Sequence, residues 1–527
     1  MSIVQSIILS QGWRRALIAA LAGAFGALAM APFDIWPAMI IPMTLAVWLL
    51  DGAASGETRF SMGSLRAAAL IGWFWGFGYF VAGLWWLGAA FLVEADKFAA
   101  LMPLGVIGLP AALAFFPCFG FVLARLLWSA GWARIFALGV GLGASEALRA
   151  TILTGFPWNA PGMALGGTLL LAQSASIFGL FGLNLLAIIL FGAPALMIEP
   201  KTRRLAVLLP VLGLAALALY GSVRLSLTPT EWVKGVKLRI MQPNIPLDDH
   251  FRPENRMAIL QKYLSLSDRA KSAQSGGIND VTHLIWPESP FPAVLSRDAE
   301  MLSAIGQFLP AQTTLITGAV RMEQSPAEPQ PHYFNAMQVL ASGGSIIASY
   351  DKVHLVPFGE YLPLESSLRA LGLTQFVQMP GGFEAGTWNK PLKIPNLPLA
   401  VPAICYEAIF PSEIIANGPR AELIINITND TWFGRTPGPY QHLALARLTA
   451  LSTGLPLVRA ANSGVSAVID PAGRILDSLP LNVADVLDSP LPKALGQTIF
   501  ARFGAYPAAL LYFLCLLVAL NGRRQKN

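Results

Sequence analysis

Residues 401–407 have the sequence Val-Pro-Ala-Ile-Cys-Tyr-Glu. The apolar first part predicts a buried β-strand, and a thiol, Cys405, ends that strand next to the carboxylate of Glu407. A free cysteine in such a place is often only a small hydrophobic residue. Cys405 is nevertheless the one cysteine outside the apolar runs, because Cys118 and Cys515 fall inside them. The basic residues described below place this segment outside the cytoplasm, where an unpaired thiol is prone to oxidation, so we expect a functional reason for it.

Strand-like runs and helical stretches alternate on both sides of this segment, between about residues 229 and 495. The expected strands are Leu238–Met241, His283–Trp286, Thr314–Gly318, Ala336–Leu340, Leu399–Ile404, Leu423–Ile427 and Leu457–Ala460. The expected helices include Glu254–Ala273, Asp298–Phe308 and Gln441–Ser452. Such alternation predicts one α/β layered domain.

The chain as a whole has the composition of a membrane protein. Hydrophobic residues make up 54% of the 527 residues and charged residues 13%, with a mean hydropathy of +0.56. A water-soluble protein of this size carries about twice that charged share. Because the apolar residues are gathered into long runs, the sequence predicts a polytopic α-helical membrane bundle.

We predict about eight membrane spans, since a helix needs about 20 residues to cross the hydrocarbon core. They are expected near residues 14–31, 36–50, 65–92, 98–127, 134–152, 168–198, 204–223 and 499–521. The run 98–127 contains Pro103, Pro110 and Pro117, so it is either one kinked helix or a helix plus a re-entrant piece.

The net charge is +6, and many of the basic residues lie between apolar runs. These are Arg14 and Arg15, Arg59 and Arg66, Arg125 and Arg134, Lys201, Arg203 and Arg204, and Arg523, Arg524 and Lys526. Their regular alternation places both termini in the cytoplasm and favours topology signals over a nucleic-acid site. The expected domains are a seven-span bundle at 1–228, an outside domain at 229–495, and an eighth span with a tail at 496–527. Arg149 breaks the pattern and is expected to pair with Glu146.

Several common active-site motifs are absent from the sequence. There is no Gly-x-Ser-x-Gly elbow, no His-Glu-x-x-His helix and no phosphate loop ending in Gly-Lys-Ser/Thr. The glycine-rich run 139–143 lies within a predicted span and indicates close helix packing rather than a dinucleotide loop. His283 is expected to be a packed core residue, and His354 and His442 are weaker candidates for a site. We predict no metal and no cofactor.

Three segments carry side chains suited to chemistry. Glu288 follows an apolar strand, in the position where α/β folds collect functional groups, although a solvated loop glutamate is the simpler interpretation. Lys352 follows a strand and precedes an apolar loop, and its simpler interpretation is a surface lysine. Cys405 is the third.

Together these segments resemble the nitrilase superfamily, which has Glu, Lys and Cys in this order. The resemblance covers most of residues 236–476, including Gln-Pro-Asn at 242–244 and Asn-Ile-Thr-Asn-Asp at 426–430. It implies an α/β nitrilase-like αββα sandwich domain with a Glu–Lys–Cys triad.

The chemistry of the three side chains agrees with this resemblance. A thiol is only a few per cent ionised near neutral pH, so it needs a base beside it, and Glu288 can take its proton. Attack of the thiolate on a carbonyl creates an oxyanion, which Lys352 and the backbone N–H of Tyr406 can stabilise. The product is a thioester on Cys405.

The loop after Lys352 is unusually apolar and is interrupted by glycine and proline. Its apolar residues are Leu355, Val356, Pro357, Phe358, Leu362, Pro363, Leu364, Leu371, Leu373, Phe376 and Val377. We expect a flap over a site that opens at the outer membrane surface, with a packed lid that does not contact lipid as the alternative.

Seven spans, a nitrilase-like domain and a final span resemble the bacterial apolipoprotein N-acyltransferases. Ala-Pro-Phe at 31–33 and Gly-Phe-Pro-Trp at 155–158 are also similar to that family. The resemblance implies that a phospholipid, typically phosphatidylethanolamine, gives an acyl chain to Cys405. The N-terminal amine of an S-diacylglyceryl-cysteine lipoprotein then takes it in a ping-pong reaction.

The same resemblance implies that Glu288 is the base, Lys352 the oxyanion stabiliser and Cys405 the nucleophile. It implies supporting roles for Glu360, Glu407, Tyr406 and Asn335. The expected location is a bacterial inner membrane with the catalytic domain in the periplasm. Nothing in the sequence demands a second subunit, so a monomer is expected.

Two other functions remain open at this stage. A membrane-tethered nitrilase-like amidase would use the same three residues but would pass the thioester to water. A transporter or lipid-binding protein would carry the outer domain as a non-catalytic module, although the predicted spans hold few ionisable residues for an ion-coupled path.

Overall fold

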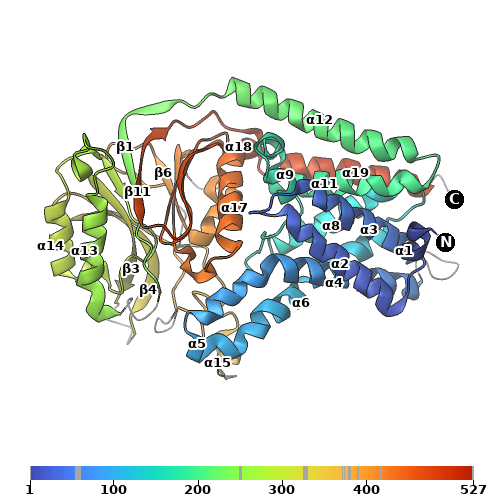
Figure 1. Ribbon diagram of the computed structural model, residues 1–527, viewed down its shortest axis with the longest axis horizontal. Coiled ribbons are helices and arrows are strands. Elements are labelled where there is room, and N and C mark those ends of the chain that lie inside the picture. Colours follow the sequence, from blue (N-terminus) through green and yellow to red (C-terminus); the bar gives the residue numbers. More distant parts are fainter. Residues whose placement is uncertain are drawn as a thin grey trace. The chain divides into compact units, whose positions relative to one another are not determined.

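Apolar helices fill the first part of the chain and return at its end (Figure 1). The computed structural model describes residues 2–53, 61–247, 252–324, 330–370, 372, 374–377, 382–387, 391–415 and 418–524. The chain divides into two units, Met1–Thr228 with Gln497–Asn527, and Pro229–Gly496.

The first unit is a helical bundle. Its α-helices are α1 (Ile3–Ile8), α2 (Gly12–Gly26), α3 (Ile40–Asp51), α4 (Met62–Leu84), α5 (Ala95–Phe98), α6 (Leu109–Leu113), α7 (Phe115–Leu126), α8 (Arg134–Arg149), α9 (Met163–Gly166), α10 (Leu169–Ala172), α11 (Ala175–Gly192), α12 (Arg203–Leu227), α18 (Ile499–Phe503) and α19 (Tyr506–Arg524). The main packing pairs are α2 with α4, α4 with α7, α7 with α8, and α8 with α11 and α19.

Within the described residues, five helical stretches are long and apolar enough to cross a membrane. They are Met62–Leu92, Ala95–Leu126, Ala175–Ile198, Arg203–Leu227 and Tyr506–Arg524. Trp36–Asp51 is a shorter apolar helix, while α2 has 15 residues and α8 has 16. The proline-rich run is one irregular helical stretch with a π-helical turn at Leu104–Gly108. About eight spans therefore stays a prediction.

Two details of the bundle agree with the sequence analysis. Glu146 and Arg149 form a buried ion pair on α8. In the glycine-rich run, a Cβ on Gly141 would lie 2.4 Å from the carbonyl oxygen of Gly120, and one on Gly143 would lie 2.3 Å from the hydroxyl of Tyr512. The glycines thus serve close helix packing.

The second unit contains two mixed β-sheets. The six-stranded sheet has the order β11-β1-β2-β3-β4-β5, and the five-stranded sheet has the order β10-β9-β8-β7-β6. The strands are β1 (Trp232–Gln242), β2 (His283–Ile285), β3 (Thr314–Glu323), β4 (His332–Leu340), β5 (Ile346–Asp351), β6 (Ala400–Ile404), β7 (Leu423–Thr428), β8 (Leu457–Ala461), β9 (Ser466–Ile469), β10 (Ile475–Leu479) and β11 (Asp485–Pro492). Strands β1, β2 and β3 are parallel to one another, as are β6, β7 and β8.

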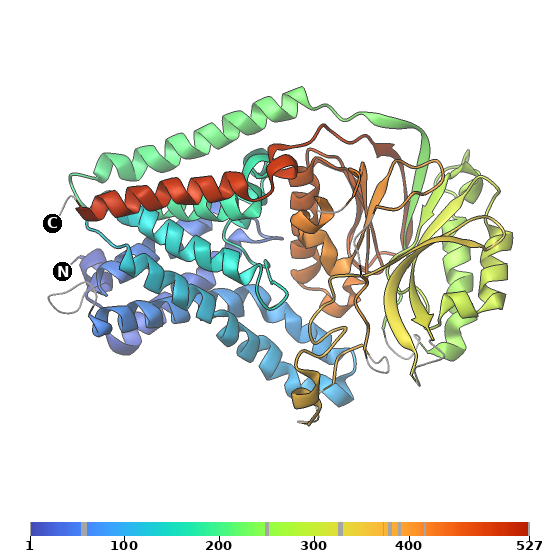
Figure 2. The same ribbon diagram turned by 180° about the vertical axis from the view of Figure 1, so that it is seen from behind.

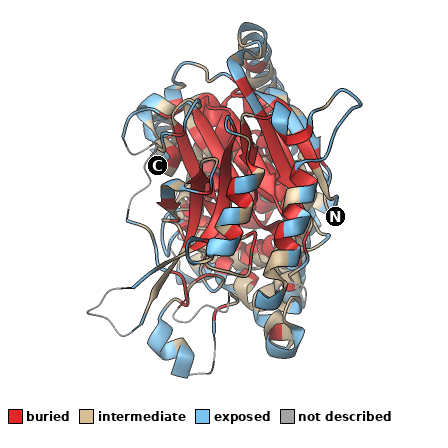
Figure 3. Cartoon of the chain, turned by 90° about the vertical axis from the view of Figure 1, so that its left-hand side faces the viewer, coloured by how far each residue is buried: buried red, intermediate tan, exposed pale blue. Residues whose placement is uncertain are grey.

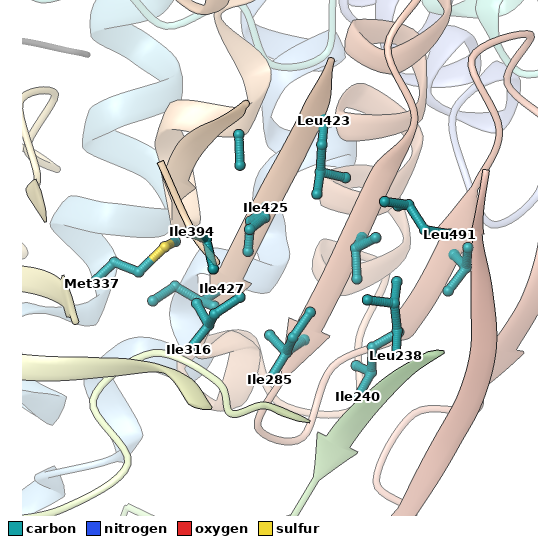
Figure 4. Close-up of a cluster of buried hydrophobic side chains, with 14 of the residues drawn as sticks. Leu238, Ile240, Ile285, Ile316, Met337, Ile394, Leu423, Ile425, Ile427 and Leu491 are labelled. Carbon is teal, nitrogen blue, oxygen red and sulfur yellow. The ribbon is translucent and has the colours of Figure 1, made fainter. Parts of the chain in front are cut away.

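The two sheets pack face to face around one apolar core (Figure 4). Ile240, Ile285 and Ile316 from the first sheet belong to the same buried cluster as Ile425 and Ile427 from the second. Burying a side chain of this size stabilises the fold by about 1.5–3 kcal/mol.

Helices cover the outer faces of both sheets (Figure 2). They are α13 (Arg256–Ser267) and α14 (Ala299–Phe308) on the first sheet, and α17 (Gly438–Thr453) on the second, with α15 (Glu365–Ala370) and α16 (Pro411–Ile415) in the connections. The strands are buried, and the outer faces of α13 and α14 are exposed (Figure 3). The unit is the αββα sandwich that the sequence predicts.

The predicted helix Glu254–Ala273 is too long at its C-terminal end, because α13 stops at Ser267. The buried guanidinium of Arg239 donates to the carbonyl oxygen of Ser267 at 2.7 Å. This contact satisfies a helix-end carbonyl and fixes the end there.

Candidate active site

The predicted residues lie where strands of both sheets end. Glu288 comes three residues after β2, Lys352 directly after β5, and Cys405 directly after β6. Because Glu288 and Lys352 belong to one sheet and Cys405 to the other, the sandwich is what brings the three segments together.

Lys352 lies in a buried cluster with two carboxylates. Its Nζ is 2.8 Å from Oε2 of Glu360 and 3.6 Å from Oε1 of Glu288. The amide of Asn335 on β4 donates to both carboxylates at 2.7 Å. The backbone N–H of Asn429 donates to the other oxygen of Glu288 at 2.9 Å. Neither simpler interpretation holds, because Lys352 is 1% exposed and Glu288 is 7% exposed.

Burial and neighbouring charges set the protonation of this cluster. Burial raises the pKa of Glu288, the ammonium of Lys352 opposes that rise, and Glu360 adds to it, leaving the pKa above its ordinary value. Burial alone would lower the pKa of Lys352, but Glu360 and Glu288 raise it, so the ammonium stays charged. The cluster thus holds a fixed cation next to a carboxyl that takes up a proton readily.

Cys405 has an unusual backbone conformation, with a φ of +52°. A non-glycine residue in this left-handed region is strained by about 1–3 kcal/mol, and such strain collects at functional sites. Burial raises the pKa of the thiol, Glu288 raises it further and Lys352 opposes both. The thiol is therefore protonated at neutral pH and needs a base. Its electrostatic coupling to Glu288 and Lys352 connects it to the cluster.

Glu407 links the Cys405 segment to the Lys352 segment. Its Oε1 accepts from the backbone N–H groups of Val353 and His354 at 2.8 and 3.1 Å, and from the hydroxyl of Tyr350 at 2.7 Å. Its Oε2 accepts from the N–H of Ile404 at 2.7 Å. Because Ile404 precedes Cys405, this single carboxylate braces both segments.

Tyr406, the fourth predicted supporting residue, is buried beside the nucleophile. Its ring packs edge-on against His354 and Phe410, with centroid separations of 5.5 and 5.0 Å. The four predicted supporting residues thus each contact the Lys352 segment, the Cys405 segment or the carboxylate of Glu288.

A second polar network reaches Cys405 from the other side, and only part of it was expected. The Nε2 of His442 on α17 lies 3.1 Å from the carbonyl oxygen of Cys405, and its Nδ1 lies 2.9 Å from Oδ1 of Asp430. Nη2 of Arg459 on β8 lies 2.7 Å from Oδ2 of Asp430. From the sequence, His442 is only a weak candidate for a site, and Arg459 is not among the predicted site residues. One signal was available, because Arg459 interrupts an otherwise apolar strand.

His283 is buried, as predicted, with its ring nitrogens 2.8 Å from the Thr282 hydroxyl and the Pro395 carbonyl. Among the described residues, no group of three or more His, Cys, Asp or Glu side chains is arranged to hold a metal ion.

Comparisons with known proteins agree with this architecture over the whole chain. Residues 22–193 match the apolipoprotein N-acyltransferase N-terminal domain, and residues 237–499 match the carbon-nitrogen hydrolase family. An apolipoprotein N-acyltransferase of Rhodopseudomonas palustris is 50% identical, covering 99% of this chain and 98% of its own length. Proteins of the same name from Bradyrhizobium diazoefficiens and Brucella melitensis are 48% and 44% identical, covering 100% and 98% of this chain and 98% and 97% of their own lengths.

The chain belongs to the apolipoprotein N-acyltransferase family.

Membership in this family confirms the resemblance predicted from the sequence. The protein is an acyltransferase, and with its long apolar helices it is a bacterial membrane protein. A non-catalytic transport or lipid-binding protein is no longer a competing interpretation. A mutant amidase from Nesterenkonia sp. AN1 is 20% identical, with a TM-score of 0.35 over 50% of this chain and 93% of that chain.

The apolar loop of this family member is partly packed and partly exposed. Leu355 is buried with Val320 and Phe383, whereas Phe358 is 49% exposed and Leu364 is 80% exposed. The backbone N–H of Val356 donates to Oε2 of Glu360 at 2.8 Å, which ties the base of the loop to the Lys352 cluster. Leu371 and Leu373, which the sequence analysis placed in the same loop, lie outside the described residues.

Proposed function

We propose that this acyltransferase moves a fatty acyl chain from a phospholipid to the N-terminal amine of a diacylated lipoprotein through a thioester on Cys405. The observation that carries the proposal is the buried contact of Lys352 with Glu288 and Glu360, electrostatically coupled to the strained Cys405. The donor is expected to be phosphatidylethanolamine, the protein a monomer, and the reaction the last step of lipoprotein maturation.

In the first half-reaction Glu288 takes the proton of the Cys405 thiol. The thiolate attacks the ester carbonyl of the phospholipid, and the resulting oxyanion is stabilised by the charged Nζ of Lys352. The C–O bond of the ester then breaks. The lysophospholipid oxygen leaves with the proton that Glu288 held, and the acyl chain remains on sulfur as a thioester.

In the second half-reaction the neutral amine of the lipoprotein attacks the thioester carbonyl. Glu288 takes the proton that the nitrogen loses, the C–S bond breaks, and the sulfur of Cys405 regains that proton. The raised pKa of Glu288 suits it to carry a proton in both directions.

The membrane arrangement proposed for this reaction follows the basic residues of the sequence. About eight spans would place both termini in the cytoplasm of a bacterial cell and residues 229–495 in the periplasm of its inner membrane. The exposed apolar side chains of Phe358 and Leu364 support a loop that meets the outer leaflet.

A labelling experiment tests this function directly. Purified protein is incubated with phospholipid that is radiolabelled in its acyl chains. We expect label on the protein that hydroxylamine removes, and its transfer to a diacylated lipopeptide with a free amine. An N-acetylated lipopeptide is the matched control and should not release the label.

The variants fix the assignment of the nucleophile. Cys405→Ala should take up no label, whereas Cys515→Ala, which removes a thiol from α19, should label as the wild type does. Label that persists in Cys405→Ala contradicts the proposal. Rapid loss of label to water without lipopeptide would instead favour the membrane-tethered amidase.

A further inference from the structure

The strained backbone at Cys405 requires something to hold it. A φ of +52° places a β-carbon and a carbonyl oxygen in close approach, and the residue relaxes to a negative φ unless its surroundings prevent this. The strand β6 ends at Ile404, so its ladder no longer constrains the next residue. The thiol is useful only if its direction is fixed, which makes the contacts of the Cys405 backbone important.

One of those contacts comes from a residue outside the Glu–Lys–Cys cluster. His442 is completely buried on α17, and its Nε2 lies 3.1 Å from the carbonyl oxygen of Cys405. A carbonyl oxygen only accepts hydrogen bonds, so Nε2 carries a hydrogen and donates it. His442 is 37 positions away from Cys405 in the sequence, and its hydrogen bond holds the carbonyl group of the strained residue itself.

The other ring nitrogen of His442 is held in place as well. Nδ1 lies 2.9 Å from Oδ1 of Asp430 and 3.0 Å from Nη2 of Arg459. Burial alone would raise the pKa of Asp430, but Arg459 and His442 lower it below its ordinary range, so this carboxylate is ionised at neutral pH. With Nε2 as the donor, the neutral ring accepts at Nδ1 from Nη2 of Arg459, and the ionised carboxylate of Asp430 holds that guanidinium in place.

Asp430 and Arg459 have little freedom to move. Asp430 Oδ2 accepts from Arg459 at 2.7 Å, and Oδ1 accepts from the hydroxyl of Thr428 at 3.0 Å. A Cβ on Gly464 would lie 2.2 Å from Oδ2, so the backbone closes tightly over the carboxylate.

We propose that His442, oriented by Asp430 and Arg459, is a positioning residue that holds the carbonyl of Cys405 and so fixes the direction of the nucleophile. This inference rests on the proposed role of Cys405. It concerns acyl loading, because a misplacement of about 1 Å at a reacting atom costs roughly 100-fold in rate. A purely structural network, which would only join α17 to the sheet, is the competing explanation.

Two substitutions separate these explanations by the length of the side chain. In His442→Asn the amide oxygen reaches about as far as Nδ1, so it keeps the acceptor for Arg459 and loses the donor to Cys405. In His442→Gln the amide nitrogen reaches about as far as Nε2, so it keeps the donor to Cys405 and loses the acceptor for Arg459. His283→Asn removes a buried, doubly hydrogen-bonded histidine elsewhere in the same domain and is the matched control.

The measurement is the single-turnover rate of thioester formation from acyl-labelled phosphatidylethanolamine, over a range of lipid concentrations. We expect His442→Asn to be slower by roughly 100-fold with an unchanged half-saturating lipid concentration. His442→Gln should stay within about tenfold of the wild type, even where its thermal unfolding temperature falls. His283→Asn should label at the wild-type rate.

The results that overturn the inference are distinct from those that overturn the function. If the wild type forms no thioester, the function fails. If the wild type labels and folded His442→Asn labels equally fast, or folded His442→Gln is slowed as much as the Asn variant, only the positioning role fails. Should the Asn variant not fold, the Gln variant decides alone, because a loss of roughly 100-fold in folded protein contradicts the role.

Discussion

Two carboxylates, those of Glu288 and Glu360, share the single ammonium of Lys352 in the buried cluster beside Cys405. This excess of negative charge decides which carboxylate takes the thiol proton. Glu360 lies 2.8 Å from Nζ of Lys352, whereas Glu288 lies at 3.6 Å. The closer carboxylate neutralises most of the charge, so Glu288 is left less stabilised as an anion and is the better base. Glu360 thereby acts on the chemistry through Lys352.

This arrangement predicts an acid limb in the rate of thioester formation. Glu288 must be ionised to take the thiol proton, and its pKa is raised above its ordinary value of 4.5 because burial disfavours the anion. As the pH falls through the raised pKa, the base is protonated and the rate is lost. The single-turnover rate measured against pH should therefore have an acid midpoint above 4.5.

Two carboxylate variants check the assignment of that limb. Glu288→Gln should remove the limb together with most of the rate, while Glu300→Gln, which changes an exposed carboxylate on α14, should leave both unchanged. An acid midpoint at or below 4.5, or a limb that survives in Glu288→Gln, contradicts the role of Glu288 as the base.

Glu288, Lys352 and Cys405 were predictable from the sequence as candidates, and the second network largely was not. Each of the three follows a strand, but strand ends meet at one edge only for Glu288 and Lys352, because Cys405 belongs to the other sheet and is brought in by the packing of the two sheets. Asp430 begins a short 3-10 helix after β7 and His442 lies on α17, and only the packing of α17 on the five-stranded sheet brings them to Cys405. The separation of these residues along the sequence does not predict that they lie close together in space.

At the scale of elements, burial gives the predicted strands their apolar signal. Strands such as β7 and β8 are buried along their whole length and give mainly apolar runs. Strand β10 has mostly accessible residues, carries little apolar signal and was not predicted, and the alternating strand β5 was expected before Lys352 only without bounds. Their place is set by pairing with β4 and β9, which a local pattern does not contain.

The helices of the bundle approach one another most closely at glycines, which gives a prediction for the membrane unit. A Cβ on Gly78 of α4 would lie 1.9 Å from the carbonyl oxygen of Ala20 on α2. Because that neighbour is backbone, it cannot turn aside, and Gly78→Ala should force the two helices apart. We expect a loss of about 1–3 kcal/mol, seen as a lower thermal unfolding temperature in detergent.

A second glycine of the same unit provides the control. The nearest atoms to a Cβ on Gly192 of α11 are 3.8 Å away, which is ordinary van der Waals contact. Gly192→Ala should therefore unfold at or slightly above the wild-type temperature, since alanine favours the helix. Equal unfolding temperatures for Gly78→Ala and Gly192→Ala would contradict the close approach of α2 and α4.

At the scale of the whole molecule, the chain crosses from one unit to the other at Thr228 and returns at Gln497. Among the described residues of the unit between them, no helix is long and apolar enough to span a membrane, so we expect both crossings to lie on the same side of it. α12, which precedes the first crossing, begins with the basic residues Arg203 and Arg204. α19, which follows the second crossing, ends with Arg523 and Arg524. Since basic residues tend to stay in the cytoplasm, we expect each of these two helices to run from one membrane face to the other.

This charge pattern predicts the side of the membrane that holds the catalytic unit. Alkaline phosphatase, which is active only outside the cytoplasm, should be active when fused after Trp232 and inactive when fused after Lys201. Green fluorescent protein fused after Arg524 should fluoresce, because it folds in the cytoplasm. Phosphatase that is active after Lys201 and inactive after Trp232 would indicate the opposite orientation. The nitrilase-like unit would then lie in the cytoplasm, away from a periplasmic lipoprotein substrate. Phosphatase activity at both positions would instead contradict a membrane span at α12. The pair of fusions therefore tests both the existence of this span and its direction.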